Sequence, residues 1–159
     1  MAILENFIIH YGYLAIFLVL VLGVVGLIIP IPDECLMLLI GYFTKDGTLD
    51  FKISLLICFI GSIIGMLVSY YIGKKAGRPF MNRFGKLIGF TEKRIVRTSK
   101  WIHKYGPYSI IVSYFIPGIR HITFYLCGVS HMRLKTCMLY ASVGSITWCL
   151  IFISFGRIF

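Results

Sequence analysis

The sequence is poor in acidic residues and in charged residues of any kind. Only 6 of its 159 residues are Asp or Glu, and charged residues make up 14% of the chain. Soluble domains carry about 25% charged residues, so this composition argues against a soluble globular protein. The length suits one domain, and we expect a single membrane domain over residues 1–159.

The sequence also lacks the motifs of common enzyme sites. It contains no HExxH, Walker or GxSxG sequence and no CxxC pair. Its cysteines are scattered through apolar segments, which is typical of small packing residues. They are Cys35, Cys58, Cys127, Cys137 and Cys149. We therefore predict that the protein is not an enzyme and uses no metal and no cofactor.

Long apolar stretches are present instead. Hydrophobic residues make up 58% of the chain, and they gather in four stretches. These run from about Tyr13 to Phe43, Ile53 to Gly73, Tyr108 to Val129 and Leu134 to Phe155. The second and fourth are long enough to cross a hydrocarbon core of roughly 30 Å as helices. Small residues at helical spacing, such as Gly61 with Gly65 and Gly144 with Ser145, favour close helix packing and permit a homo-oligomer.

The first and third stretches are interrupted near their middles. Pro30 and Pro32 break the first, and Pro117 with Gly118 breaks the third. Proline removes a backbone donor and clashes with the preceding helical turn. At membrane depth, broken backbone persists only where protein buries it or it lines a wet cavity. We predict two helical segments in each stretch, arranged as re-entrant hairpins; a surface loop is the alternative for the first break.

The order of these stretches predicts an internal duplication. A broken stretch and a span form one repeat over about residues 13–73, and the same pair recurs over about 108–155. A cytoplasmic loop between them would make the two halves enter the membrane from opposite sides. We therefore predict an all-α, multi-pass integral membrane protein built as an inverted repeat, with its binding site at the repeat interface.

The connecting loop, about residues 74–107, is strongly basic. Ten Lys and Arg residues lie between Lys74 and Lys104, against the single acid Glu92. In a chain this apolar, we expect the loop to face anionic lipid on the cytoplasmic side rather than nucleic acid. A helix capped by Thr91 and ending at Gly106–Pro107 is predicted there, amphipathic and interfacial, with a solvated helical face as the alternative.

Ionisable residues follow both breaks. Asp33 and Glu34 come directly after Pro32, and Arg120 and His121 come shortly after Gly118. A charge at bilayer depth costs about 2.5–3.5 kcal/mol, so it is kept where it is paired, solvated or used. We predict that these acids and bases meet around a polar cavity. Snorkelling is the alternative for Arg120, and His121 is either a proton carrier or a packed neighbour.

Four elements of the sequence resemble the DedA family, also described as the SNARE-associated or VTT-domain family. Pro30–Glu34 resembles its PxPxE element, and Gly65–Gly77 resembles its G-D-x-x-x-Y-x-x-G-R-x-x-G element. Phe115–Arg120 followed by Gly128 resembles its R-F-x-P-x-x-R…G element. Gly144 with Trp148 is similar to its final-helix pattern. These elements occur in order with the family's spacing over nearly the whole chain.

The resemblance implies paired re-entrant hairpins and lipid translocation across the bacterial cytoplasmic membrane. Members are implicated in returning undecaprenyl phosphate or phosphatidylethanolamine. Glu34 matches the motif acid and Arg120 the second arginine, whereas Tyr114 stands where the motif has its first arginine. The predicted site thus offers one arginine, which would bind phosphate, and one carboxylate, Glu34 or Asp33, which would bind ammonium. This balance of charge favours zwitterionic phosphatidylethanolamine over a polyprenyl monophosphate, which carries nearly two negative charges.

We therefore expect a flippase, with Arg120, Glu34, Asp33, His121 and Tyr114 contacting the headgroup of a phospholipid or polyprenyl phosphate. Two other classes stay open. An intramembrane lipid phosphatase would combine His121 with Ser113 or Asp33, and an assembly factor would use only the packing faces.

Overall fold

The structure is a computed structural model that describes residues 11–18, 20–21, 33–84, 92–116 and 119–158. Regular secondary structure in these ranges is all helical, with no strand, which agrees with the predicted all-α class. Residues 11–18 and 20–21 are helical. The later helices are α2 (Asp33–Lys45), α3 (Phe51–Phe84), α4 (Glu92–Tyr105), α5 (Tyr108–Ser113), α6 (Ile119–Val129) and α7 (Leu134–Ile158).

Two helices, α3 and α7, are long and apolar enough to cross a membrane. The qualifying segments are Phe51–Gly77, with 27 residues, and Leu134–Ile158, with 25 residues. They contain the predicted spans Ile53–Gly73 and Leu134–Phe155. Large apolar side chains stay exposed along both helices, including Leu56 at 58% and Leu139 at 65%. Exposed apolar surface of this extent suits contact with lipid chains.

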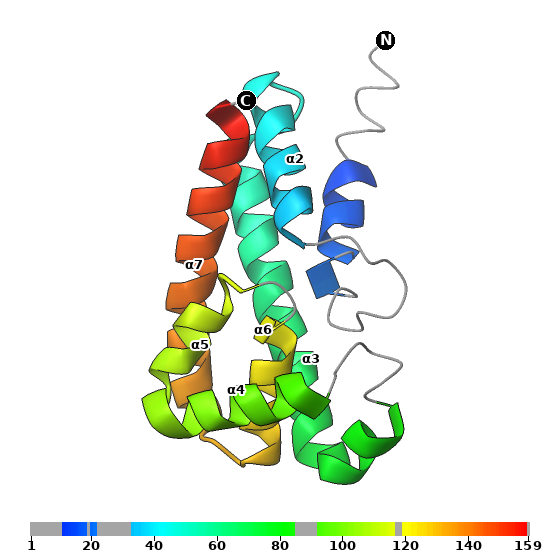
Figure 1. Ribbon diagram of the computed structural model, residues 1–159. Helices are drawn as coiled ribbons and strands as arrows, with labels where there is room; N and C mark the ends of the chain where they lie inside the picture. Colours follow the sequence, from blue (N-terminus) through cyan, green and yellow to red (C-terminus); the bar gives the residue numbers. More distant parts are fainter. Residues whose placement is uncertain (1–10, 19, 22–32, 85–91, 117–118, 159) are drawn as a thin grey trace.

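Two other helices, α2 and α6, are half as long. They have 13 and 11 residues, which is about 20 Å and 16 Å at 1.5 Å per residue. Both begin near mid-height of the bundle and run towards opposite ends (Figure 1). The third apolar stretch thus forms two separate helices, α5 and α6, within the predicted bounds. The break residues Pro30, Pro32, Pro117 and Gly118 lie outside the described residues.

Each short helix packs on the long helix of the other half of the chain. α2 lies mainly along α7, and α6 lies mainly along α3 (Figure 1). At both contacts a glycine from each helix approaches the other backbone so closely that a Cβ atom would overlap a carbonyl oxygen. The glycines and the residues whose carbonyls they meet are Gly41 with Ile153, Gly156 with Leu38, Gly73 with Tyr125 and Gly128 with Tyr70.

Two tyrosine hydroxyls fasten α3 to α6 and to the turn that follows it. Tyr70 donates to the Met132 carbonyl at 2.6 Å, and Tyr125 donates to the Gly77 carbonyl. Gly77 has a φ of 57° and interrupts the helical path of α3 before Pro79. The second bond therefore satisfies a carbonyl at the point where the helix bends.

The small-residue faces expected on α3 and α7 are used within the chain. Gly61 of α3 lies against Leu20, with a would-be Cβ 3.2 Å from the Leu20 Cβ. Gly144 of α7 lies against the Tyr114 ring and the backbone of Ile111. Homo-oligomer formation through these faces stays a prediction.

The predicted amphipathic helix is α4, which lies across one end of the bundle (Figure 1). Thr98 and Ile102 are buried, and α4 packs on α5 and α6. The helix ends where Gly106 adopts a φ of 56° and donates its N–H to the Ile102 carbonyl at 2.8 Å. A left-handed glycine is a common helix end, so the predicted stop at Gly106–Pro107 is confirmed. The predicted cap Thr91 lies outside the described residues.

Candidate functional site

Arg120 is a buried cation near the middle of the bundle. It is the second residue of α6, and only 6% of it is exposed. Its guanidinium carbon lies 4.6 Å from the ring centroid of Trp148 and 5.5 Å from that of Tyr114. Cation–π contacts of this kind are strongest where water is excluded. Arg120 thus points into the protein, and it does not snorkel to the surface.

Tyr114 covers Arg120 from the segment after α5. The residue is 1% exposed, its ring packs edge-on against Phe124 at 5.7 Å, and its hydroxyl accepts a hydrogen bond from Ser62 Oγ at 3.3 Å. The ring also fills the space beside Gly144, where a Cβ would lie 2.6 Å from Tyr114 Cδ2. Gly144 therefore lets Tyr114 reach its position between α7 and Arg120.

Trp148 contacts Arg120 from α7, and Ser145 lies three residues before it on the same helix. Both are fully buried. The sequence indicates Ser145 only as a small packing residue and Trp148 only as part of the final-helix pattern, so neither was predicted at the site. One signal was available: Gly144, Ser145 and Trp148 are spaced to lie on one face of a helix.

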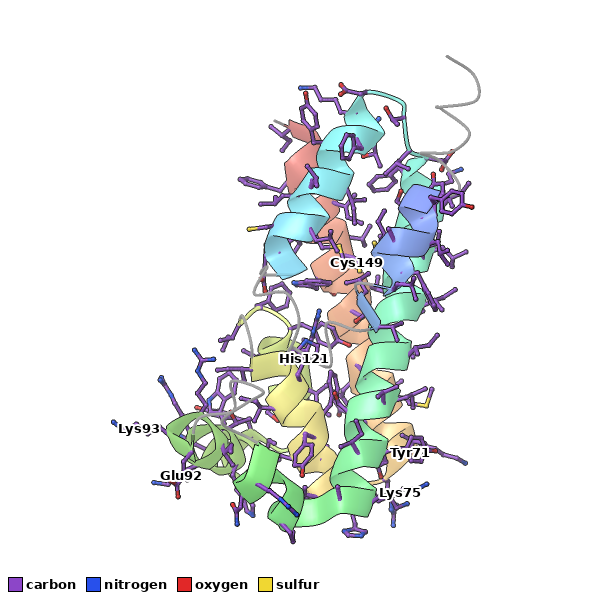
Figure 2. All side chains as sticks on the ribbon, turned by 90° about the vertical axis from the view of Figure 1, so that its right-hand side faces the viewer. Tyr71, Lys75, Glu92, Lys93, His121 and Cys149 are labelled. Atoms are coloured by element: carbon purple, nitrogen blue, oxygen red, sulfur yellow. The ribbon has the colours of Figure 1, made fainter. Side chains whose placement is uncertain are left out.

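The acidic half of the predicted site lies at the start of α2. Glu34 is half-buried in the first turn, and Asp33 begins the helix. His121 is half-buried beside Arg120 in sequence, near mid-height of the bundle (Figure 2). The structure therefore brings Tyr114 and Arg120 into contact and starts both short helices near the middle of the bundle (Figure 1). Pairing of the acids with Arg120 stays a prediction.

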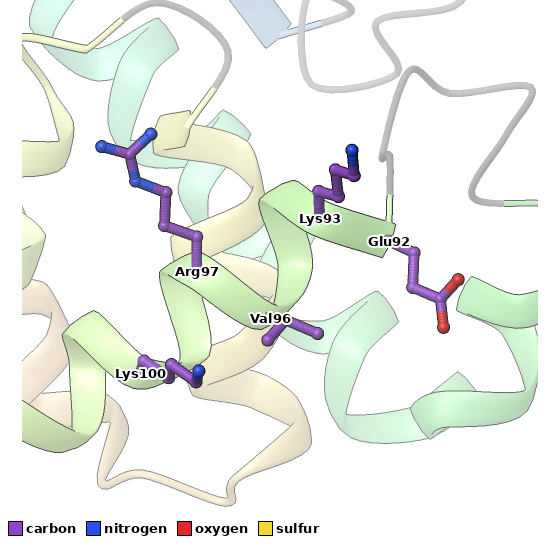
Figure 3. Close-up of a pocket in the computed structure, with 5 residues that line it drawn as sticks. All are labelled: Glu92, Lys93, Val96, Arg97 and Lys100. Atoms are coloured by element: carbon purple, nitrogen blue, oxygen red, sulfur yellow. The ribbon is translucent and has the colours of Figure 1, made fainter.

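Basic side chains gather at the end of the bundle that carries α4, which we call the basic end. Figure 2 shows Lys75 and Lys93 there. Three cations of α4, namely Lys93, Arg97 and Lys100, line a groove of about 440 Å³ together with Glu92 and Val96 (Figure 3). At the opposite end, Lys45, Lys52 and Arg157 are accompanied by Asp46 and Asp50. The described residues thus have a strong charge asymmetry along the bundle.

Enzyme-like groups are sparse in the described part of the chain. Within it, no three His, Cys, Asp or Glu side chains gather closely enough to hold a metal ion. Ser113, the nucleophile of the phosphatase alternative, donates its hydroxyl to the Ile110 carbonyl at 2.7 Å. That hydroxyl is buried and engaged with its own helix. The geometry around Arg120 suits binding of an anionic group better than covalent chemistry.

Comparison with known proteins places this arrangement among membrane proteins. The family model described as VTT domain matches residues 31–158, a range that includes α2 to α7. The uncharacterized membrane protein YbfM of Bacillus subtilis (strain 168) is 52% identical over 99% of this chain and 96% of its own. No solved structure matches.

Two further relatives carry names that suggest functions. Undecaprenyl phosphate transporter A of Staphylococcus aureus (strain NCTC 8325 / PS 47) is 31% identical over 98% of this chain and 77% of its own. The alkaline phosphatase-like protein of Lactococcus lactis subsp. cremoris (strain MG1363) is 26% identical over 92% of this chain and 70% of its own.

Proposed function

Because the chain belongs to the VTT-domain family, which its resemblance to DedA proteins predicted, we propose that it moves a phosphate-bearing lipid across the bacterial cytoplasmic membrane. The observation that carries this proposal is the burial of Arg120 at mid-bundle between Tyr114 and Trp148. An ionisable residue inside the membrane is costly and usually functional. A guanidinium is well suited to phosphate because it presents several fixed donors to phosphate oxygens.

Undecaprenyl phosphate is the first candidate substrate, because a relative that aligns with nearly all of this chain is named as its transporter. Phosphatidylethanolamine is the second, favoured by the charge count of one buried Arg120 against Glu34 and Asp33. Both lipids present phosphate oxygens to the same guanidinium. The two lipids differ in the net charge of the headgroup. Undecaprenyl phosphate carries nearly two negative charges, whereas phosphatidylethanolamine is zwitterionic.

The packing of the helices supports an inverted repeat with re-entrant hairpins. α2 and α6 are both half-length, both start near mid-height, and each packs on the other half's long helix through facing glycines. The two glycines of the long helices also occupy equivalent positions. Gly73 follows the first residue of α3 by the same number of residues as Gly156 follows the first residue of α7. Helix N-termini meeting near the membrane's middle would favour an anionic headgroup there.

The charge asymmetry supports a cytoplasmic location for the basic end, since loops rich in Lys and Arg are retained in the cytoplasm. The cations of α4 would then face the anionic lipids of the inner leaflet. In this orientation α2 runs from the middle of the membrane towards the outer surface, and α6 runs from the middle towards the cytoplasm.

The test is lipid movement in liposomes that contain the purified protein. We expect the wild type to move labelled undecaprenyl phosphate or labelled phosphatidylethanolamine between leaflets, and Arg120→Ala to move neither. Arg157→Ala is the matched control, because Arg157 also stacks on a ring, that of Phe51, but at the opposite end of the bundle. A folded Arg120→Ala protein with wild-type transport would refute the proposal.

The phosphatase alternative, which the sequence leaves open, gains support from the name of the Lactococcus lactis relative. A phosphatase is distinguished from a transporter by incubating both lipids with the purified protein and measuring the phosphate that is released. We expect no release above the rate of a protein-free sample, and release that His121→Ala abolishes would favour the enzyme instead.

A further inference from the structure

Two polar groups on the face of α7 that carries Trp148, the residue stacked on Arg120, lack a well-placed hydrogen-bond partner. Ser145 Oγ and Trp148 Nε1 form no hydrogen bond of good geometry, and both residues are 0% exposed. The nearest polar side chains to Ser145 belong to Tyr114 and Cys149. Buried polar groups are nearly always hydrogen-bonded, because leaving one unsatisfied destabilises the protein. Water is scarce at this depth of a membrane, so it supplies no ready substitute. These two groups therefore need an explanation.

The two groups belong to one cluster with the buried cation. Ser145 and Trp148 lie three residues apart, on one face of α7. The indole ring of Trp148 stacks on the Arg120 guanidinium. Gly144, the neighbour of Ser145, lies against the Tyr114 ring that also contacts Arg120. The cluster thus joins an indole N–H, a hydroxyl and a guanidinium, all of which can donate.

We propose that Trp148 Nε1–H and Ser145 Oγ–H donate hydrogen bonds to phosphate oxygens of the lipid headgroup that Arg120 binds. This inference rests on the proposed function and adds two residues to the headgroup site. An indole N–H only donates, and an ionised phosphate oxygen only accepts, so the two are complementary. The donors are held in place without an acceptor, ready for the headgroup, which preorganises the site.

Because the cluster is buried, a side chain must move before a headgroup can reach it. Tyr114 packs against Arg120 and Gly144, and its ring centroid lies 6.2 Å from that of Trp148. In this proposal its ring closes the cluster. The headgroup reaches Ser145 and Trp148 when this ring moves away from α7. Tyr114 therefore acts as the cover of the phosphate site.

The chain offers matched controls for both donors. Ser54 Oγ in the first turn of α3 and Thr98 Oγ1 on α4 are also buried without a partner. Ser54→Ala removes the same group as Ser145→Ala, but at the end of the bundle where α3 begins, away from Arg120. Trp101→Phe on α4 matches Trp148→Phe, which keeps the aromatic ring under Arg120 and removes the N–H.

The experiment measures ligand affinity and thermal unfolding of the purified full-length protein in detergent. The ligands are farnesyl phosphate, dihexanoyl phosphatidylethanolamine and inorganic phosphate, so the results distinguish the two lipid classes from free phosphate. We expect Trp148→Phe and Ser145→Ala each to weaken lipid binding by about tenfold, as loss of a hydrogen bond to a charged group does. The unfolding temperature of Ser145→Ala without ligand should stay equal or rise, because this variant removes an unsatisfied hydroxyl. Trp148→Phe also places a smaller ring in the core, so this variant is judged by its ligand affinity.

Three outcomes would overturn the inference. The first is wild-type affinity in both variants. The second is a lower ligand-free unfolding temperature of Ser145→Ala, which would mean that the Ser145 hydroxyl has a partner in the folded protein. The third is no binding of any phosphate ligand by the wild type. Its failure is separable from that of the proposed function. Transport that needs Arg120 but neither donor would refute only this inference, whereas donor-dependent binding without transport would refute only the transport function.

Discussion

Arg120 and Trp148 meet at the centre of the bundle with the guanidinium carbon 4.6 Å from the indole ring centroid. Tyr114 provides a second ring at 5.5 Å. A guanidinium is flat and can stack on rings while its N–H groups still donate, whereas a lysine ammonium is a compact point charge. The geometry therefore depends on arginine and not only on positive charge.

Arg120→Lys is expected to lose most of the transport activity, by about tenfold or more, although the charge is kept. Loss of the stacked contacts should also lower stability by about 1–2 kcal/mol. Liposome transport and thermal unfolding in detergent measure the two effects. Arg157→Lys is the control and should leave both values close to wild type; equal transport by Arg120→Lys and wild type would contradict the expected need for a planar group.

Gly73→Ala and Gly156→Ala are each expected to destabilise the protein by about 1–3 kcal/mol, because a methyl group would overlap a carbonyl of the facing helix. Gly12→Ala is the matched control, since nothing lies within 4 Å of a Cβ at that helical position. It should be neutral or more stable by up to about 1 kcal/mol. Unfolding curves in the same detergent compare the three, and equal stability of all variants would disprove the close helix contacts.

Tyr125→Phe is expected to cost about 1 kcal/mol of stability, because it leaves the Gly77 carbonyl without its tyrosine donor. Hydrogen exchange should rise around the bend of α3 near Gly77. Tyr71→Phe is the control, because Tyr71 is 46% exposed on the same helix. If exchange near Gly77 stayed at the wild-type rate, the bond would have no structural role.

Substitution of Lys93, Arg97 and Lys100 by Gln is expected to weaken association with anionic membranes. Each cation near such a surface contributes about 1 kcal/mol, and salt screens the effect. The control replaces Lys45, Lys52 and Arg157, an equal number of cations at the opposite end. Binding of detergent-solubilised protein to anionic nanodiscs at low and high salt compares the two sets; equal loss from both would show no special role for the groove of α4.

The sequence predicted the helices of this protein well because their signals are local. Tyr108–Val129 and Leu134–Phe155 coincide closely with α5–α6 and α7, since runs of apolar residues and helix-breaking residues act within a few turns. The end of α4 at Gly106 followed from one glycine before a proline.

The surroundings of Arg120 could not be predicted in the same way. Ser62, Tyr114 and Trp148 come from three separate parts of the chain, and only tertiary packing brings them together around one cation. A single sequence contains no signal for such a contact. The position of Tyr114 is the clearest case: in the motif it corresponds to an arginine, whereas in the structure it is the ring that covers Arg120.

The pairing of α2 with α7 also has a consequence for how the protein is made. α2 leaves the ribosome early, but its main packing partner is synthesised after all the other described helices. Until then the glycine-bearing face of α2 has no permanent neighbour in the bilayer. Long-range contacts of this kind slow folding and leave intermediates open to misassembly, so the first half of the bundle must persist unfinished in the membrane until α7 has been synthesised.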